Sequence, residues 1–253
     1  MDTVRDTVLI YRRQLQLSLR NPLWVLFGLA QPALYLVLFG PLLTGLVGRP
    51  GFPSGNAWQI YTPGLLVQLC LFGSAFVGFA LIADWRAGVL ERMRVTPVSR
   101  AAPLLGRLLR DVTVTSIQSL ILIGTAFALG LRVSVAGIAV AMAFVAAIVV
   151  AVSALSYALA MTTRNEDSFA QVINLLTVLL LLLSGILLPM ALAPRWLANL
   201  SALSPLRYMV DAVRDAFTGH LLTPTVMLGG GLAVLFAAGA VGLGCYSFTR
   251  GDR

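Results

Sequence analysis

The residues with the most chemistry in this chain lie in one polar stretch, residues 84–111, between two long apolar runs. The stretch holds six arginines and three acids, so its side chains can form ion pairs and charge-assisted hydrogen bonds. Its centre combines an apolar patch with flanking charges, in the order Val89, Leu90, Glu91, Arg92, Met93 and Arg94. A short amphipathic helix of this kind can dock in a groove of another protein and transmit its movement.

The residues around this amphipathic segment predict where the chain turns. Gly88 permits a bend before it, and Thr96-Pro97 forces an extended step after it, because a residue that precedes proline avoids the helical region. Ser99 can cap a helix that carries the chain back toward the membrane. From these features alone, an ordinary arginine-rich loop is as good an interpretation as a docking helix.

The sequence contains no recognisable catalytic or metal-binding pattern. HExxH, GxSxG and paired carboxylates within the apolar runs are all absent, and two isolated cysteines with one histidine provide no metal-ligand spacing. All eighteen basic residues are arginine, whereas the phosphate-cradling GxxxxGK[ST] loop needs a lysine. We therefore expect no catalytic residue, metal or cofactor in this chain. If ATP drives the protein, ATP and Mg bind to a partner chain.

Composition places the rest of the chain in a membrane. Hydrophobic residues make up 58% and charged residues 11%, with a mean hydropathy of +0.90, whereas charged residues approach a quarter of a soluble domain. No interval is long enough for a soluble domain, so we predict one all-α membrane domain over residues 1–253. The arginines cluster at the ends of the apolar runs, which favours membrane lipids over nucleic acid as their partner.

Six apolar runs approach the roughly 20 residues that a helix needs to cross a bilayer. They are residues 23–47, 62–83, 112–131, 135–161, 169–188 and 223–248. With the N-terminus inside, thirteen arginines lie on the inner side and five on the outer side, which predicts cytoplasmic termini and a cytoplasmic 84–111 stretch. The runs hold no well-buried acid, arginine or histidine, which disfavours an ion-coupled carrier.

Two amphipathic segments accompany the spans. Residues 1–22 predict an interfacial helix suited to an anionic inner leaflet, with apolar positions at Val4, Val8, Tyr11, Leu15 and Leu19. Residues 189–222 are too charged to span and predict outer or re-entrant helices between the fifth and sixth spans. The second of these helices has one apolar face, formed by Leu206, Met209, Val210, Val213 and Phe217.

Neutral polar side chains inside the spans are the candidates for a substrate path. They include Gln31, Gln68 and Asn174. Hydrogen bonds between helices are the commoner use of such residues in membranes, so packing is the alternative interpretation for each of them.

Two motifs make the chain resemble a known family, the permease subunits of ABC type-2 exporters, in particular their daunorubicin-resistance and nodulation-exporter branch. The first is LERMRVTPVSR within the polar stretch. The second is the family signature, which ends in proline, an apolar residue, any residue, an aromatic or basic residue, five of any kind, and arginine or glutamine. Here the signature residues are Pro205, Leu206, Tyr208 and Arg214.

The resemblance implies a half-transporter that pairs with a second permease copy or a paralogue, above separate ATP-binding cassette subunits. It implies that the helix in the polar stretch contacts those subunits, through Val89, Leu90, Glu91, Arg92, Met93, Arg94, Thr96 and Pro97. The expected activity is export of a hydrophobic or amphipathic, drug-like molecule across a bacterial cell membrane. Export of a lipid-linked glycan or lipooligosaccharide, and a secondary carrier that needs no ATP, are the alternatives.

Overall fold

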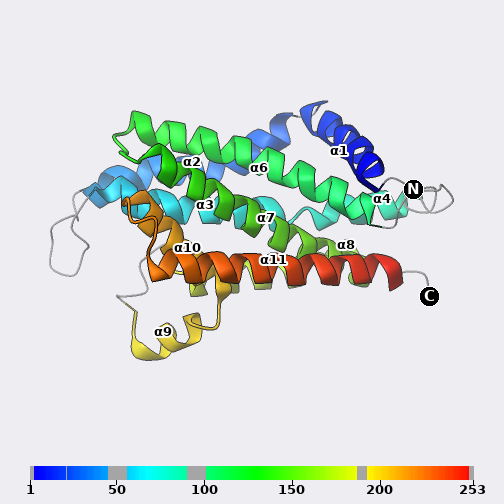
Figure 1. Ribbon diagram of the computed structural model, residues 1–253. Helices are drawn as coiled ribbons and strands as arrows, with labels where there is room; N and C mark the ends of the chain where they lie inside the picture. The colour runs from blue at the N-terminus through cyan, green and yellow to red at the C-terminus, as the bar shows by residue number, and fades with distance from the viewer. Residues whose placement is uncertain (1–2, 21, 45–55, 90–100, 187–192, 251–253) are drawn as a thin grey trace.

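The computed structural model describes residues 3–20, 22–44, 56–89, 101–186 and 193–250, and all regular structure in these ranges is α-helical (Figure 1). The helices are α1 (Thr3–Arg20), α2 (Pro22–Thr44), α3 (Ala57–Ala75), α4 (Gly78–Arg86), α6 (Ala102–Ala128), α7 (Val135–Thr163), α8 (Glu166–Leu183), α9 (Arg195–Ser201), α10 (Pro205–Phe217) and α11 (Pro224–Arg250). One end of the molecule holds the start of α1, the whole of α4 and the end of α11. The helices α9 and α10 lie at the opposite end.

Five helical stretches are long and apolar enough to cross a membrane. They are Ala57–Arg86, which combines α3 and α4, and then Ala102–Ala128, Val135–Thr163, Glu166–Leu183 and Pro224–Phe248. Each overlaps one of the predicted runs, so five of the six predicted runs are confirmed as candidate spans. The remaining run coincides with α2, whose described side chains provide a shorter apolar helix, Gly28–Leu38, so the sixth span stays a prediction.

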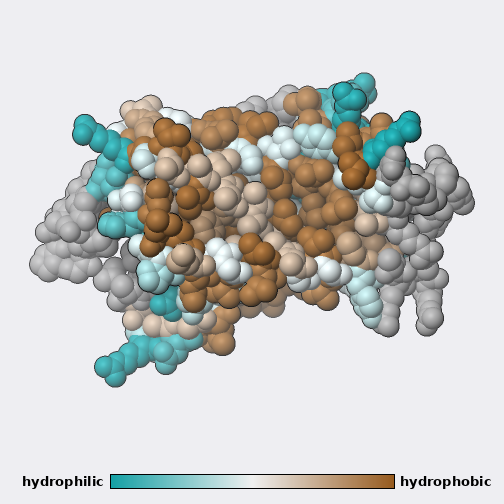
Figure 2. Space-filling model, in the orientation of Figure 1, coloured by the Kyte–Doolittle hydropathy of each residue, from teal (hydrophilic) through white to brown (hydrophobic). Residues whose placement is uncertain are grey.

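The surface has the distribution of side chains that a bilayer requires. On the face shown in Figure 2, apolar side chains form a broad band along the bundle and polar side chains gather toward its two ends. Large apolar side chains are well exposed on several helices, as with Leu38 (61%), Leu175 (63%) and Leu235 (70%). Hydrocarbon is the environment in which such exposed leucines cost nothing, because lipid tails are as apolar as they are.

The helix α7 forms the centre of the bundle and packs against α3, α4, α6, α8, α10 and α11. Its sequence is rich in alanine and serine, and small residues let neighbouring helices approach closely. On the α11 side, a Cβ atom added to Gly244 would lie 3.5 Å from the carbonyl oxygen of Ala154 and 3.0 Å from a methyl of Leu104. Glycine at this position therefore allows α11 to lie directly against the central helix.

The helix α10 is wedged into the bundle by the apolar face that its sequence predicts. All five side chains of that face are 1% exposed or less: Leu206, Met209, Val210, Val213 and Phe217. They pack against α11, α7 and α3. The contact with α11 is close, because a Cβ on Gly229 would approach the backbone oxygen of Tyr208 to 2.8 Å.

The polar stretch 84–111 contains less loop than its composition indicates. The helix α6 already begins at Ala102, so residues 102–111 are the first turns of a candidate span. Arg107 and Asp111 on these turns are only 4% and 3% exposed. The predicted run 112–131 itself holds no acid or arginine, but the helix that contains it extends back through these two buried charges. Hydropathy ends a span at its first charged residue, but these charges are buried because each has a partner.

Candidate functional site

The candidate site is the base of the polar stretch, residues 84–89 and 101–111, here named the loop base. Its first limb ends in a tight turn, where the Ala87 amide donates to the Ala83 carbonyl and the Gly88 amide to the Trp85 carbonyl, each at 3.0 Å. Gly88 has φ 68°, a conformation that glycine adopts without steric cost. The predicted bend at Gly88 is therefore confirmed.

The predicted coupling residues begin where this turn ends. Val89 is half-buried and follows the turn directly. The other members of the set lie outside the described residues: Leu90, Glu91, Arg92, Met93, Arg94, Thr96 and Pro97. Their role stays a prediction, and the structure instead shows how the two limbs on either side of them are held.

An ion pair ties the two limbs of the loop base together. Arg107 of α6 donates through Nη2 to Oδ2 of Asp84 in α4, at 2.5 Å. The arginine side chain is 4% exposed and the aspartate side chain 33%. A buried guanidinium that loses its carboxylate is strongly destabilising, so this contact fixes the distance between the limbs.

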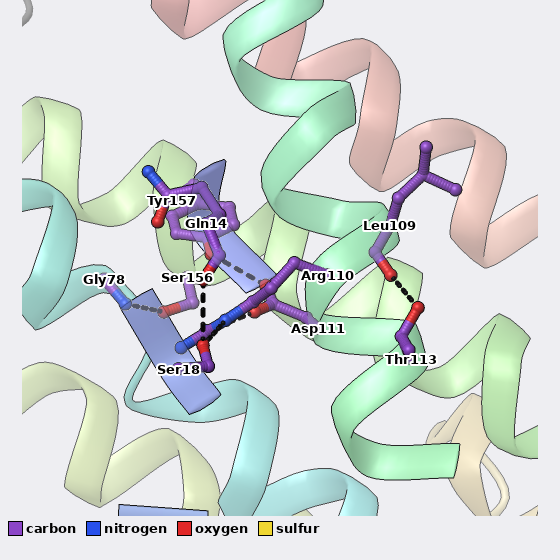
Figure 3. A network of polar contacts seen from close by, with 9 residues as sticks. All are labelled: Gln14, Ser18, Gly78, Leu109, Arg110, Asp111, Thr113, Ser156 and Tyr157. Atoms are coloured by element: carbon purple, nitrogen blue, oxygen red, sulfur yellow. Dashed lines mark hydrogen bonds and ion pairs between the residues drawn. The ribbon is translucent and has the colours of Figure 1, made fainter. Parts of the chain in front are cut away.

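A second polar cluster connects the loop base with α1 and α7 (Figure 3). Asp111 of α6 accepts a hydrogen bond from the Tyr157 hydroxyl at 2.7 Å and one from Arg110 Nη1 at 2.6 Å. Arg110 also donates through Nε to the hydroxyl of Ser18 at 2.7 Å. The helix α6 is therefore hydrogen-bonded to α1 through Arg110 and to α7 through the buried carboxylate of Asp111.

The first limb is also attached to the turn between α7 and α8. Arg86 forms an ion pair with Glu166 at 2.9 Å, and the Arg164 guanidinium lies 5.5 Å from the centre of the Trp85 ring. The ion pair is exposed, with side chains 52% and 43% accessible, so it contributes little stability. Together these contacts orient α4 relative to the start of α8.

The helix α1 packs on the loop base. A Cβ on Gly106 would lie 2.8 Å from Ile10 Cγ2 and 3.0 Å from the Thr7 carbonyl oxygen, so α1 and α6 almost touch here. The Tyr11 hydroxyl lies 3.2 Å from Thr113 Oγ1. The predicted N-terminal helix is thus confirmed, but most of its predicted apolar face points away from the protein: Val4 is 77% exposed, Val8 44% and Leu19 69%.

The signature residues of α10 have structural positions. Pro205 occupies the first turn of the helix, where its missing amide costs no hydrogen bond. Leu206 is fully buried, and the Tyr208 hydroxyl donates to the Ala202 carbonyl at 3.1 Å, which links α10 to the end of α9.

Arg214, the last signature residue, joins α10 to two other helices. Its Nη2 donates to the Gly185 carbonyl at 2.7 Å, just beyond the end of α8, and its Nε lies 3.4 Å from the Ile60 carbonyl of α3. Its Nη1 pairs with Asp211 at 3.3 Å. Burial lowers the pKa of Arg214, and burial also raises the pKa of Asp211 even though Arg214 opposes that shift.

The three candidates for a substrate path do not converge. Gln68 is 1% exposed in α3, and its Oε1 has no hydrogen-bond partner among the described residues. Gln31 on α2 and Asn174 on α8 are exposed. Since one is buried and two face outward, these side chains do not line a common interior path within one copy of the chain.

Sequence reasoning missed the residues that hold the loop base, above all Arg107, Asp111 and Tyr157. Two signals were available. Arg107 and Asp111 are four residues apart, which places both on one face of α6. Tyr157 is the one tyrosine in the apolar run 135–161, and a buried tyrosine hydroxyl usually has a hydrogen-bond partner.

Comparison with known proteins assigns the family. The family model described as ABC-2 type transporter matches residues 5–218. This chain belongs to the ABC-2 type transporter family. A Cyanophora paradoxa protein named as a transport permease, ycf38, is 30% identical over 213 residues, which cover 83% of this chain and 73% of the relative. A Mycobacterium tuberculosis protein named as the doxorubicin resistance ABC transporter permease DrrC is 26% identical over 229 residues, 88% of this chain and 81% of the relative.

A third relative of this ABC-2 permease comes from Streptomyces coeruleorubidus and is named as the daunorubicin resistance ABC transporter permease DrrB1. It is 26% identical over 192 residues, which cover 74% of this chain and 66% of the relative. The family model covers both the loop base and the signature in α10, so the resemblance stated from the two motifs is confirmed. As a permease, the chain is the membrane component of a transporter, and ABC permeases associate with ATP-binding subunits.

Proposed function

We propose that this ABC-2 permease is the transmembrane subunit of an ATP-driven exporter that moves a hydrophobic or amphipathic, drug-like molecule out across a bacterial cell membrane. ATP and Mg bind to a separate cassette subunit, which docks on residues 89–97. The observation that carries the proposal is the loop base. A docking segment transmits force only if its two ends are held, and here both are.

The contacts of the loop base support a mechanical role. Arg107 and Asp84 fix one limb to the other at 2.5 Å, and Asp111 joins the second limb to α7 through Tyr157 at 2.7 Å. A displacement that reaches either limb would therefore be passed on to the two long helices α6 and α7. A loop that serves only to connect two spans would need none of these buried charges, which are costly to place.

The outward face of α8 supports pairing with a second permease copy or a paralogue. Only 17% of the apolar window of this helix is buried within the chain. Its exposed side chains include Leu175 and Leu182, but also the amides of Gln171 and Asn174. Lipid offers no hydrogen bond to an amide, whereas a facing helix does, so a protein partner suits this face better than lipid alone.

The cargo is proposed from the relatives. Two of them are named for resistance to doxorubicin or daunorubicin, which supports a drug-like molecule. Export of a lipid-linked glycan is the alternative. The two cargoes are separated by competition in proteoliposomes, where an anthracycline and a lipid-linked oligosaccharide are each offered against a labelled anthracycline.

The experiment is to replace Glu91 or Arg92 by alanine in the complex with its ATP-binding partner, reconstituted in proteoliposomes. We expect loss of cargo-stimulated ATP hydrolysis and about a tenfold drop in export, because the docking contact is lost. Arg132→Gln is the matched control, since Arg132 is an exposed arginine in the connection between α6 and α7. Unchanged coupling in both loop variants, or export by the permease without its partner, would refute the proposal.

A further inference from the structure

The span that leads into the loop base is broken in its middle. The helix α3 ends at Ala75, α4 begins at Gly78, and Phe76 and Val77 form a turn between them. In an unbroken helix, Ala75 would accept a hydrogen bond from the Phe79 amide four residues on. Here the Phe79 amide donates to the Phe76 carbonyl at 3.2 Å instead.

One serine of α7 bonds to a backbone group on each side of this break, and its bond with Gly78 is drawn in Figure 3. The hydroxyl of Ser156 donates to the Ala75 carbonyl at 2.6 Å and accepts from the Gly78 amide at 3.0 Å. Ser156 is fully buried, so water cannot replace it. An unpaired backbone group in a dry interior is costly, and the break is therefore stable only with this hydroxyl in place.

The second half of the span is seated against α8 as well as α7. A Cβ on Gly78 would approach Phe169 Cζ to 2.5 Å and the Ser156 carbonyl oxygen to 2.9 Å. The rings of Phe79 and Phe169 meet edge to face, with centroids 4.8 Å apart and planes at 86°. These contacts hold the start of α4 by side-chain packing, where the backbone hydrogen bonds of the span are interrupted.

Two consecutive residues of α7 hold the two limbs of the loop base. Ser156 bonds to the start of α4, and Tyr157 bonds to Asp111 of α6. The span that contains the first limb is interrupted between Ala75 and Gly78, whereas the second limb continues as one helix from Ala102 to Ala128.

We propose that the break at Phe76 and Val77 is a pivot about which α4 moves with the docking segment, and that Ser156 is the positioning residue that keeps the pivot hydrogen-bonded. The inference rests on the proposed function, because a partner subunit must supply the movement. The inference places the point where that movement reaches the centre of the bundle at the hydroxyl of Ser156.

The first arm of the test uses the permease alone, in lipid nanodiscs, and measures hydrogen–deuterium exchange of residues 76–86. We expect Ser156→Ala to speed the exchange of the Gly78 and Phe79 amides about tenfold, which corresponds to about 1.4 kcal/mol. Ser156→Thr keeps a hydroxyl and should restore slow exchange. Ser119→Ala is the control, because Ser119 is equally buried and its hydroxyl has no partner among the described residues.

The second arm uses the complex with its ATP-binding partner and measures cargo transported per ATP hydrolysed. We expect Ser156→Ala to lower this ratio at least fivefold while basal hydrolysis stays within twofold, a separation that a misfolded permease would not produce. Unaltered exchange in the first arm would refute the pivot, and an unaltered transport ratio would refute its role in coupling. A wild-type complex without ATP-dependent transport would refute the proposed function and the coupling role with it, while the exchange arm would still decide whether Ser156 stabilises the break.

Discussion

Replacing Asp84 by asparagine and Arg107 by glutamine, singly and together, measures what the ion pair of the loop base contributes. Asp84→Asn leaves a guanidinium that is 4% exposed without its carboxylate, which we expect to cost about 3 kcal/mol, at the lower end for a buried pair because the aspartate side was 33% exposed. Arg107→Gln leaves a carboxylate that can turn toward solvent, at a cost of about 2 kcal/mol. The double variant removes both charges and should cost about 3 kcal/mol, which gives a coupling energy of about 2 kcal/mol.

Denaturant-induced unfolding of the permease in mixed micelles is the assay, followed by tryptophan fluorescence, because Trp85 adjoins the pair and reports on α4. The matched control is the neighbouring pair of Arg86 and Glu166, whose side chains are 52% and 43% exposed. Its coupling energy should lie below about 1 kcal/mol. If the pair of Asp84 and Arg107 couples by less than about 0.5 kcal/mol, or no more than the exposed pair, the claim that it holds the limbs together is refuted.

Two further predictions concern α1 and α10. Gly106→Ala should destabilise the chain and expose α1 to protease, because the new methyl would meet Ile10 and the Thr7 backbone. Gly124→Ala on the same helix has open space and should stabilise the chain by about 0.5–1 kcal/mol. Equal effects of the two substitutions would contradict the close docking of α1. Burial raises the pKa of Asp211 above its ordinary 3.8, so the folded chain holds this proton more tightly, and the resulting stability is present below pH 3.8 and lost as pH rises through the raised pKa. The thermal midpoint of the wild type minus that of Asp211→Asn should therefore fall as pH rises across that window, and a value that rises with pH would count against the partial burial of this carboxyl.

Periodicity was enough to predict several of the elements. The run 135–161 coincides with α7 to within two residues, and the face of α10 that contains Met209 and Val213 is buried as its spacing predicts. Such predictions succeed because a helix that meets apolar surroundings must satisfy its own backbone and present apolar side chains, and both conditions are visible locally.

The contacts that make the loop base were not visible locally. The bond from Tyr157 to Asp111 spans 46 positions of the chain, and that from Ser156 to Gly78 spans 78. Nothing in the pattern around Ser156 distinguishes it from Ser153 one turn earlier, since both are serines in an apolar run. Which serine faces the break depends on the rotation of α7 against α3, and tertiary packing alone determines that rotation.

Because α1 is attached to the loop base, the surrounding lipid can act on the loop base through this helix. Its outward side carries exposed leucines beside several arginines, a combination that grips anionic headgroups and the acyl layer beneath them. Through Ser18 this helix is fastened to Arg110, and through Arg110 to the carboxylate that Tyr157 holds. Lateral pressure or headgroup charge that shifts α1 would therefore also displace Arg110 and Asp111 in the loop base. The turnover of the transporter should then depend on the lipid composition around α1.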